Sequence, residues 1–263
     1  MPDEATALAG RGVLVTRPPG QAWRLARVLE RHGARVLRFA LVEIAAPSDP
    51  HAAQASLARV AHSDLVIFVS ANAVRFAAHL LPDLPARLDR TRIACVGDAT
   101  AAALQAIGVA SHVVPQQAST SEALLALDEL QSASVQGKEV AIVRGEGGRE
   151  LLARALEQRG ARVGMIEVYR REPPRGDLPA FLDAHAADID LLIVTSGEAL
   201  QRLASLGGID RVRRLPLVLP SDRVLEQAVA LGFAGPFSVP GRMNDGELVR
   251  AAARLAASLA GGS

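Results

Sequence analysis

The strongest constraint on the fold of this chain is that its first half is repeated, at low similarity, in its second half. Residues 17–36 read RPPGQAWRLARVLERHGARV, and residues 144–163 read RGEGGRELLARALEQRGARV. The identical positions run from Arg17 and Arg144 to Val36 and Val163 at a constant spacing of 127 residues. Such a period is far longer than the roughly 20–50 residues of a solenoid repeat. We therefore expect two related domains, with a ligand site between them.

Two more blocks repeat in the same order. The segment DLVIFVS at 64–70 is similar to DLLIVTS at 190–196, and residues 97–108 are similar to 221–232. Each half alternates short apolar runs with longer amphipathic segments, which is typical of parallel sheets covered by helices on both faces. Gly33 and Gly160 end equivalent amphipathic segments at 22–32 and 150–159, as C-cap glycines do. The predicted strands are 12–16, 36–41, 65–70, 93–96, 112–114, 139–143, 163–168, 191–195, 217–219 and 237–239.

The repeat is compatible with two ways of building the domains. Residues 37–46 and 164–174 fall at equivalent points, and proline-bearing stretches end both segments. If the chain crosses between domains at both, one domain combines the N-terminal stretch with the C-terminal third, and the other is the middle of the chain. The alternative is a tandem split in the polar stretch 131–137 (QSASVQG). The repeat alone leaves both arrangements open.

Composition limits the classes of partner. Apolar residues make up 49% and charged residues 22%, as in soluble globular proteins. The net charge of +1 provides no bulk attraction to nucleic acid or to an anionic membrane. The N-terminus lacks the apolar segment of a signal peptide, and no stretch approaches about 18 uncharged apolar residues. We therefore expect a cytoplasmic protein with no nucleic-acid or membrane partner.

Cofactor motifs fail on inspection. In the loop 144–150, Glu150 stands where the third glycine of G-x-G-x-x-G is required, and Gly137-Lys138 is followed by Glu139 rather than Ser or Thr. The six histidines show no ligand spacing, and the single cysteine, Cys95, lies in an apolar run that favours a buried, inert thiol. We therefore expect neither metal nor dinucleotide chemistry and no P-loop.

Small polar residues gather instead in loops that follow predicted strands. In parallel α/β domains such loops meet helix N-termini, where free backbone N–H groups attract anions, although Ser, Thr and Asp there often only cap the helix. Tyr169, the only tyrosine, follows a predicted strand at the crossover, where packing is a commoner role than catalysis. The loops are 16–18, 70–72, 97–100, 144–148, 195–197 and 220–223.

Taken together, the motifs resemble the uroporphyrinogen-III synthase family over almost the whole chain. They are VLVTRP at 13–18, S-x-N-A-V at 70–74, V-G-x-x-T-A-x-A-L at 96–104, R-G-x-x-G-R-E-x-L at 144–152, E-V-Y-R-R at 167–171, and P-S-D-R with A-x-x-L-G-F within 220–233. One departure is Val69, where the family strand often ends in Thr.

The resemblance implies an α/β fold of two flavodoxin-like (Rossmann-like) parallel-sheet domains related by internal duplication and joined by a two-stranded β connector. It favours the discontinuous arrangement, with one domain at 1–38 plus 172–263, the other at 45–164, and connector strands at 39–44 and 165–171. The implied reaction converts hydroxymethylbilane to uroporphyrinogen III with loss of water and inversion of ring D through a spirocyclic intermediate, without a cofactor.

The resemblance also implies site residues. Tyr169 matches the family tyrosine proposed as a proton donor, and helix N-termini with nearby arginines suit a substrate with eight carboxylates. A monomer that receives its substrate by hand-over from hydroxymethylbilane synthase is expected. The alternative is a cytosolic two-domain small-anion-binding or sensor module without catalysis. The expected substrate-binding residues are Arg17, Ser70, Asn72, Gly97, Thr100, Arg144, Gly145, Gly148, Thr195, Ser196, Ser221 and Arg223.

Overall fold

The computed structural model describes residues 7–116, 120–148, 150–205 and 210–260 and divides the chain into two compact α/β units. Unit 1 combines the chain up to Glu43 with the chain from Glu172 onwards, and unit 2 is Ile44–Arg171. The chain passes between the units twice, in strands β3 (Glu43–Ala45) and β7 (Arg162–Glu172), which are neighbours in one sheet.

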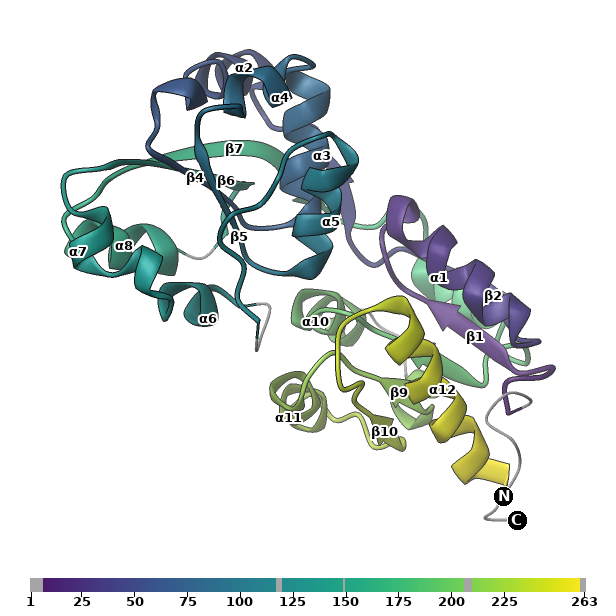
Figure 1. The fold of residues 1–263 in the computed structure, drawn as a ribbon. Helices are drawn as coiled ribbons and strands as arrows, with labels where there is room; N and C mark the ends of the chain where they lie inside the picture. Colours follow the sequence, from purple (N-terminus) through teal and green to yellow (C-terminus); the bar gives the residue numbers. More distant parts are fainter. Residues whose placement is uncertain (1–6, 117–119, 149, 206–209, 261–263) are drawn as a thin grey trace. The chain divides into compact units, whose positions relative to one another are not determined.

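Unit 1 is built on a five-stranded sheet in the order β10-β9-β8-β1-β2. The pairs between neighbouring strands in this order are all parallel. In Figure 1 the C-terminal helix α12, in yellow, lies against β9 and β10. The strands are β1 (Gly12–Val15), β2 (Arg35–Arg38), β8 (Leu191–Ile193), β9 (Leu217–Val218) and β10 (Phe237–Ser238). The helices are α1 (Pro19–Arg31), α9 (Leu178–Ala184), α10 (Gly197–Ser205), η3 (Val212–Arg214), α11 (Asp222–Ala230) and α12 (Asp245–Ala260).

Unit 2 is built on a second five-stranded sheet, in the order β3-β7-β6-β4-β5. The pairs β7–β6, β6–β4 and β4–β5 are parallel. Its other strands are β4 (Leu65–Phe68), β5 (Arg92–Cys95) and β6 (Glu139–Gly145). Its helices are α2 (Pro50–Leu57), η1 (Val60–His62), α3 (Ala71–Leu80), α4 (Leu84–Leu88), α5 (Asp98–Ala106), α6 (Ser121–Leu125), η2 (Asp128–Leu130), α7 (Ser132–Val135) and α8 (Leu151–Gln158).

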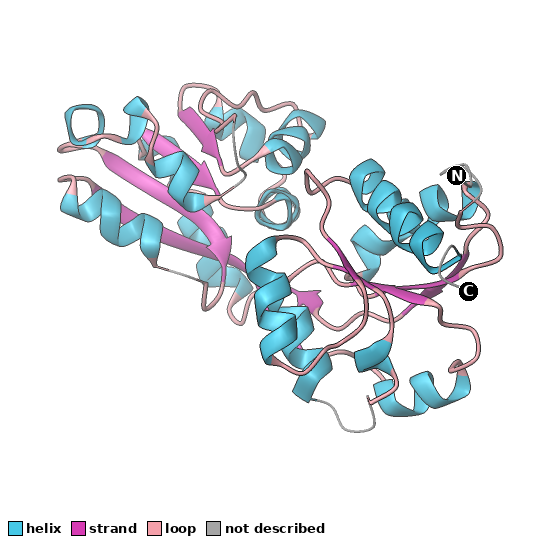
Figure 2. Ribbon diagram, turned by 90° about the horizontal axis from the view of Figure 1, so that it is seen from below, coloured by secondary structure: helices cyan, strands magenta, loops and turns pink. Residues whose placement is uncertain are grey.

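The alternation of strand side chains explains why the strand runs are apolar throughout. In β4, Val66 and Phe68 belong to one buried cluster and Leu65 and Ile67 to another, because successive side chains point to opposite faces of the sheet. Figure 2 shows helices on both faces of the strands within each unit. Both faces are therefore covered, and the expected α/β class is confirmed.

One predicted strand is wrong. Residues 112–114 form only a single parallel bridge, between Ala94 and Val113. The cause lies in the neighbouring backbone, since the N–H of Ile93 donates to Nδ1 of His112 at 3.0 Å instead of to a strand partner. The His112 side chain thus accepts the backbone N–H of Ile93, which would otherwise have extended the pairing beyond the Ala94–Val113 bridge.

The repeated blocks occupy equivalent places in different sheets. β1 pairs with β2 and β8 in unit 1, just as β6 pairs with β7 and β4 in unit 2. Unit 1 thus holds the blocks 17–36, 190–196 and 221–232, and unit 2 holds the blocks 64–70, 97–108 and 144–163. Gly33 and Gly160 both adopt positive φ, +80° and +86°, so each ends its helix in the left-handed conformation expected of a C-cap.

Candidate active site

The side chain of Tyr169 lies inside unit 2, at the carboxyl end of the sheet. Its exposed fraction is only 2%. The pairing of β6 and β7 shifts between Arg144 and Gly145, which places Gly145 opposite Tyr169. A Cβ atom at Gly145 would lie 2.5 Å from Cζ and 2.6 Å from Cε2 of the tyrosine ring. Only glycine leaves room for the ring, which also packs against Phe76 with 5.8 Å between centroids.

The hydroxyl of Tyr169 contacts one hydroxyl and one cation. It lies 3.2 Å from Oγ of Ser70, and a terminal guanidinium nitrogen of Arg171 donates to it at 3.3 Å. The guanidinium carbon of Arg171 is 5.5 Å from the ring centroid, within cation–π range. Arg171 itself is exposed, so a buried phenol is joined to the surface through an arginine.

Ser70 links this tyrosine to the N-terminus of α3. It is the N-cap residue of that helix, and its Oγ accepts from the backbone N–H of Ala73 at 3.1 Å. Its position directly after β4 puts it at the same sheet edge as Tyr169, and it is half-buried. Asn72 follows in the first turn, where its Oδ1 accepts from Arg75 at 3.2 Å.

Arg144 is buried beneath the glycine-rich loop 144–148 and donates a hydrogen bond to its backbone. It is only 5% exposed, its Nε donates to the carbonyl of Gly145 at 3.1 Å, and Glu167 lies 3.8 Å away. A Cβ atom at Gly148 would come within 2.5 Å of this guanidinium, so glycine lets the loop close over the arginine. The same loop is tied down by Glu146, which accepts from both N–H and Oγ of Ser48, at 2.5 and 2.8 Å.

The remaining expected residues of unit 2 lie at the start of α5. Gly97 is the N-cap residue with extended backbone, and it is buried. Thr100 lies in the first turn and is 5% exposed. The structure therefore brings Ser70, Asn72 and Gly97 to one sheet edge, while the side chain of Thr100 faces the interior.

Unit 1 has a matching edge with different side chains. Arg17 donates to Asp245 at 2.6 Å, its Nε lies 3.4 Å from Oγ1 of Thr195, and only 11% of its side chain is exposed. The exposed Ser196 accepts from the N–H of Ala199 at 3.1 Å at the start of α10.

The last two expected residues lie at the start of α11. Ser221 is the N-cap residue of this helix, and its side chain makes no capping hydrogen bond. Arg223 is exposed. Ser196 and Arg223 are exposed and Ser221 is half-buried, whereas the side chain of Arg17 is largely buried.

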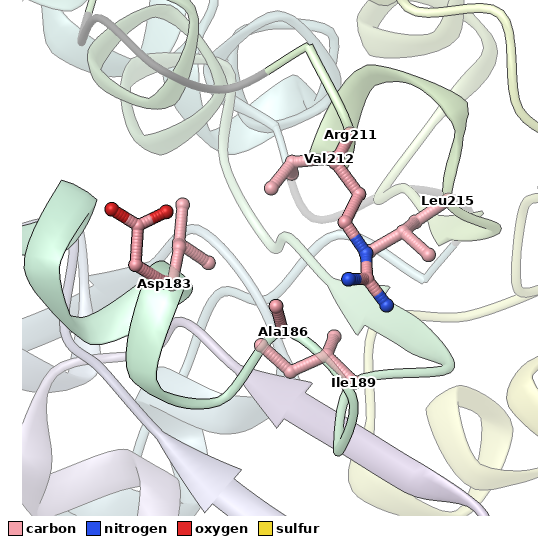
Figure 3. Close-up of a pocket in the computed structure, with 7 residues that line it drawn as sticks. Asp183, Ala186, Ile189, Arg211, Val212 and Leu215 are labelled. Carbon is pink, nitrogen blue, oxygen red and sulfur yellow. The ribbon is translucent and has the colours of Figure 1, made fainter.

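A small hollow in unit 1 lies away from these loops. Figure 3 shows it between Asp183, Ala186, Ile189, Arg211 and Leu215. Its volume is about 40 Å³, and Ile189 and Leu215 precede β8 and β9, so it lies at the amino ends of the strands. It is too small for a tetrapyrrole and is at the wrong edge of a parallel sheet for a ligand.

The sequence did not point to two partners of the expected residues. The sequence left the role of Arg171 open. Its side chain is exposed and also donates to the hydroxyl of Tyr169, and the two-residue period of a strand could have indicated this shared face. Asp245 lies 228 residues from Arg17, and no local pattern signals their ion pair.

No group of His, Cys, Asp and Glu side chains within 7–116, 120–148, 150–205 and 210–260 is arranged to hold a metal ion. In the same part of the chain, no helix has the length and apolar character needed to cross a membrane.

This chain is similar in sequence to known proteins over most of its length. Residues 24–239 match the family described as uroporphyrinogen-III synthase HemD. The chain is 37% identical over 227 residues to the uroporphyrinogen-III synthase of Salmonella typhimurium, covering 84% of this chain and 92% of that protein. It is 35% identical over 196 residues to that of Escherichia coli K12, covering 74% and 79%.

Two solved structures share the fold. A mutant uroporphyrinogen III synthase of the extremely thermophilic bacterium Thermus thermophilus superposes with a TM-score of 0.62 at 19% identity, covering 94% of this chain and 99% of that one. The synthetase of Helicobacter pylori 26695 gives a TM-score of 0.61 at 16% identity, covering 95% and 99%. On the sequence matches, this chain belongs to the uroporphyrinogen-III synthase family.

Proposed function

We propose that this chain exercises the uroporphyrinogen-III synthase activity of its family through the hydroxyl groups at the edge of unit 2. The activity is that of a hydro-lyase, which closes hydroxymethylbilane to uroporphyrinogen III with loss of water and inversion of ring D. The observation that carries the assignment to this edge is the buried hydroxyl of Tyr169, 3.2 Å from Ser70 at the N-terminus of α3.

The chemistry needs only a mild acid. The electron-rich pyrrole pushes out the hydroxyl group, the C–O bond breaks with its electron pair on oxygen, and one proton completes water. A phenol or an alcohol placed at the leaving oxygen can supply that proton. A carbon of the last ring then attacks the resulting cation, and the ring loses a proton at the end of the rearrangement. The site thus donates one proton to the leaving oxygen and recovers one proton from the last ring, so no net proton is consumed.

Binding of the polycarboxylate substrate is proposed to rest mainly on backbone N–H groups. The loops before α3, α5, α10 and α11 place helix N-termini at the carboxyl edges of the sheets, where anions are favoured. Ser196, Ser221 and Arg223 have exposed or half-buried side chains in these loops. Arg17 and Arg144 are turned towards Asp245 and the carbonyl of Gly145, so we assign them the shaping of the binding loops.

Control of the ring order is proposed to come from positioning. Unassisted, the bilane closes head to tail without inversion, so the enzyme must hold the chain with the inverted carbon of the last ring nearest the cation. Correct placement of reacting atoms can contribute several kcal/mol without any strong acid or base. Loss of a single backbone contact should then cost little, while displacement of a whole loop should cost much.

The cellular setting is a further part of the proposal. We propose a cytoplasmic monomer that takes its unstable substrate by hand-over from hydroxymethylbilane synthase and has no nucleic-acid or membrane partner. Sedimentation of the protein alone and with that enzyme tests both points. A stable dimer of the chain alone would contradict the monomer, and unchanged sedimentation with the enzyme at high concentration would contradict a lasting complex.

The activity is tested by a product assay. Hydroxymethylbilane generated enzymatically is incubated with and without the protein, oxidised, and resolved by isomer. We expect the product to change from the type I to the type III porphyrin, and Tyr169→Phe to lower the rate without abolishing it. Persistent type I product with folded protein that still binds the bilane would instead favour the sensor alternative.

A further inference from the structure

We propose that Ser70, not Tyr169, delivers the proton to the leaving hydroxyl of the substrate, and that Tyr169 then transfers its own proton to Ser70. This inference rests on the proposed function and assigns roles within that site. It follows from three observations: the burial of the tyrosine, the hydrogen bonds that its hydroxyl makes, and the comparison with the equivalent serine of unit 1.

Burial separates the two hydroxyl groups. Tyr169 is 2% exposed, enclosed by Gly145 and Phe76 within the core cluster of its unit. Ser70 is half-buried and stands at the N-terminus of α3, where ligands bind in parallel α/β domains. A substrate as bulky as a tetrapyrrole can reach the serine hydroxyl without any movement of the core, but it cannot reach the phenol in the same way.

The hydrogen bonds of the Tyr169 and Ser70 hydroxyl groups favour proton transfer from the tyrosine to the serine. Arginine carries donors only, so the phenol oxygen accepts from Arg171 at 3.3 Å. Among the described residues, the other contact of this hydroxyl is Oγ of Ser70 at 3.2 Å, where either group can be the donor. Donation by the phenol gives its buried proton a partner, so we assign the phenol as the donor of this pair. Ser70 Oγ also accepts the N–H of Ala73 at 3.1 Å. With the phenol as donor, Ser70 Oγ accepts two hydrogen bonds and keeps its own proton for the substrate.

The step balances without a further reactant. The proton of Ser70 passes to the leaving oxygen as the C–O bond breaks and water departs. The proton of Tyr169 passes to Ser70, and the resulting phenolate lies beside the guanidinium of Arg171, which offsets its charge. When the last ring loses its proton at the end of the rearrangement, that proton returns through Ser70 to Tyr169. Both residues are thereby restored.

The equivalent serine shows that capping does not need a tyrosine. Ser196 in unit 1 accepts from the N–H of Ala199 at 3.1 Å, just as Ser70 accepts from Ala73. At the 127-residue spacing of the repeat, the position of Tyr169 is held by Val42, which is buried and cannot donate a proton. The same capping contact thus forms in unit 1 without a tyrosine hydroxyl beside the serine.

The test is a double-mutant cycle on the rate of type III formation. We expect Ser70→Ala to lower kcat at least about tenfold, in the range of general acid catalysis, and Ser70→Thr to restore most of it. Because the two groups act in series, Ser70→Ala with Tyr169→Phe should be no slower than Ser70→Ala alone. Thr120→Ala is the matched control, since Thr120 caps α6 through the N–H of Ala123 at 3.1 Å and lies outside the site. It should lower the urea midpoint without lowering kcat.

A second measurement uses the native protein and does not depend on any variant folding. The rate of water loss is followed in mixtures of H₂O and D₂O. Two protons in flight give a curved dependence on the deuterium fraction, and one proton gives a straight line. A straight line, a Ser70→Ala rate equal to that of the native protein, or losses that multiply in the double variant would each overturn the relay. Failure of the native protein to form type III product would overturn the proposed function as well, so the two failures are distinguishable.

Discussion

The two units share one frame and differ in the side chains at its edge. Each has an arginine at the carboxyl end of a strand: Arg17 follows β1, and Arg144 is the next-to-last residue of β6. Both guanidinium groups are turned into the protein. Each has a serine that caps the next helix, Ser196 or Ser70. Unit 2 alone adds Tyr169 to its serine. The arginines and capping serines recur in both units, whereas the tyrosine hydroxyl that could give its serine a role in chemistry does not recur.

The largest expected effect comes from filling the space that Tyr169 occupies. In Gly145→Ala the new methyl group would meet the ring at 2.5 Å, so the ring must move and the Ser70 contact is lost. We expect a rate of type III formation at least about tenfold lower and a destabilisation of about 1–3 kcal/mol. Gly164→Ala is the control, because a Cβ there meets nothing within 4 Å. Equal rates for the two variants would show that the position of the Tyr169 ring does not affect catalysis.

A smaller effect is expected on stability, and it should differ between the carboxylate partners of Arg17 and Arg144. Asp245→Asn leaves the largely buried Arg17 without its carboxylate, and urea unfolding should show a loss of about 1–2 kcal/mol. In unit 2 the carboxylate of Glu167 is 43% exposed and 3.8 Å from Arg144, so Glu167→Gln should cost less than about 0.5 kcal/mol. If both substitutions cost the same, the carbonyl of Gly145 is not the main partner of Arg144.

The smallest effect concerns Cys95, whose equivalent in unit 1 is the buried Leu219. Burial raises the pKa of the Cys95 thiol, and contacts with Gly97 only partly oppose this. The folded protein therefore keeps a proton that the unfolded chain loses above the ordinary thiol pKa, so stability should fall as the pH rises through that value. Urea midpoints measured across this alkaline range should decline for the native protein and decline less for Cys95→Val. A thiol reagent should react only on unfolding, and fast labelling of the folded protein would contradict the burial.

Much of the architecture could be predicted from local patterns. Apolar runs such as 65–68 are strands because both of their faces are buried, and Gly33 and Gly160 end helices because glycine readily adopts positive φ. Residues 112–114 were predicted wrongly because the side chain of His112 takes a backbone donor, a contact that the pattern of apolar residues does not contain.

The sequence by itself determined that the chain is duplicated, that it belongs to the α/β class, and where its helix N-termini gather small polar residues. The repeat by itself left open which blocks share a sheet, although the family resemblance favoured the discontinuous arrangement; the tertiary structure has β1 beside β8 and β4 beside β6. The repeated blocks carry the same strand and helix pattern, so either pairing satisfies the local rules equally well. Contacts between distant segments, such as Ser70 with Tyr169 and Arg17 with Asp245, make the difference. They depend on how strands are ordered in space, and local sequence holds no record of that order.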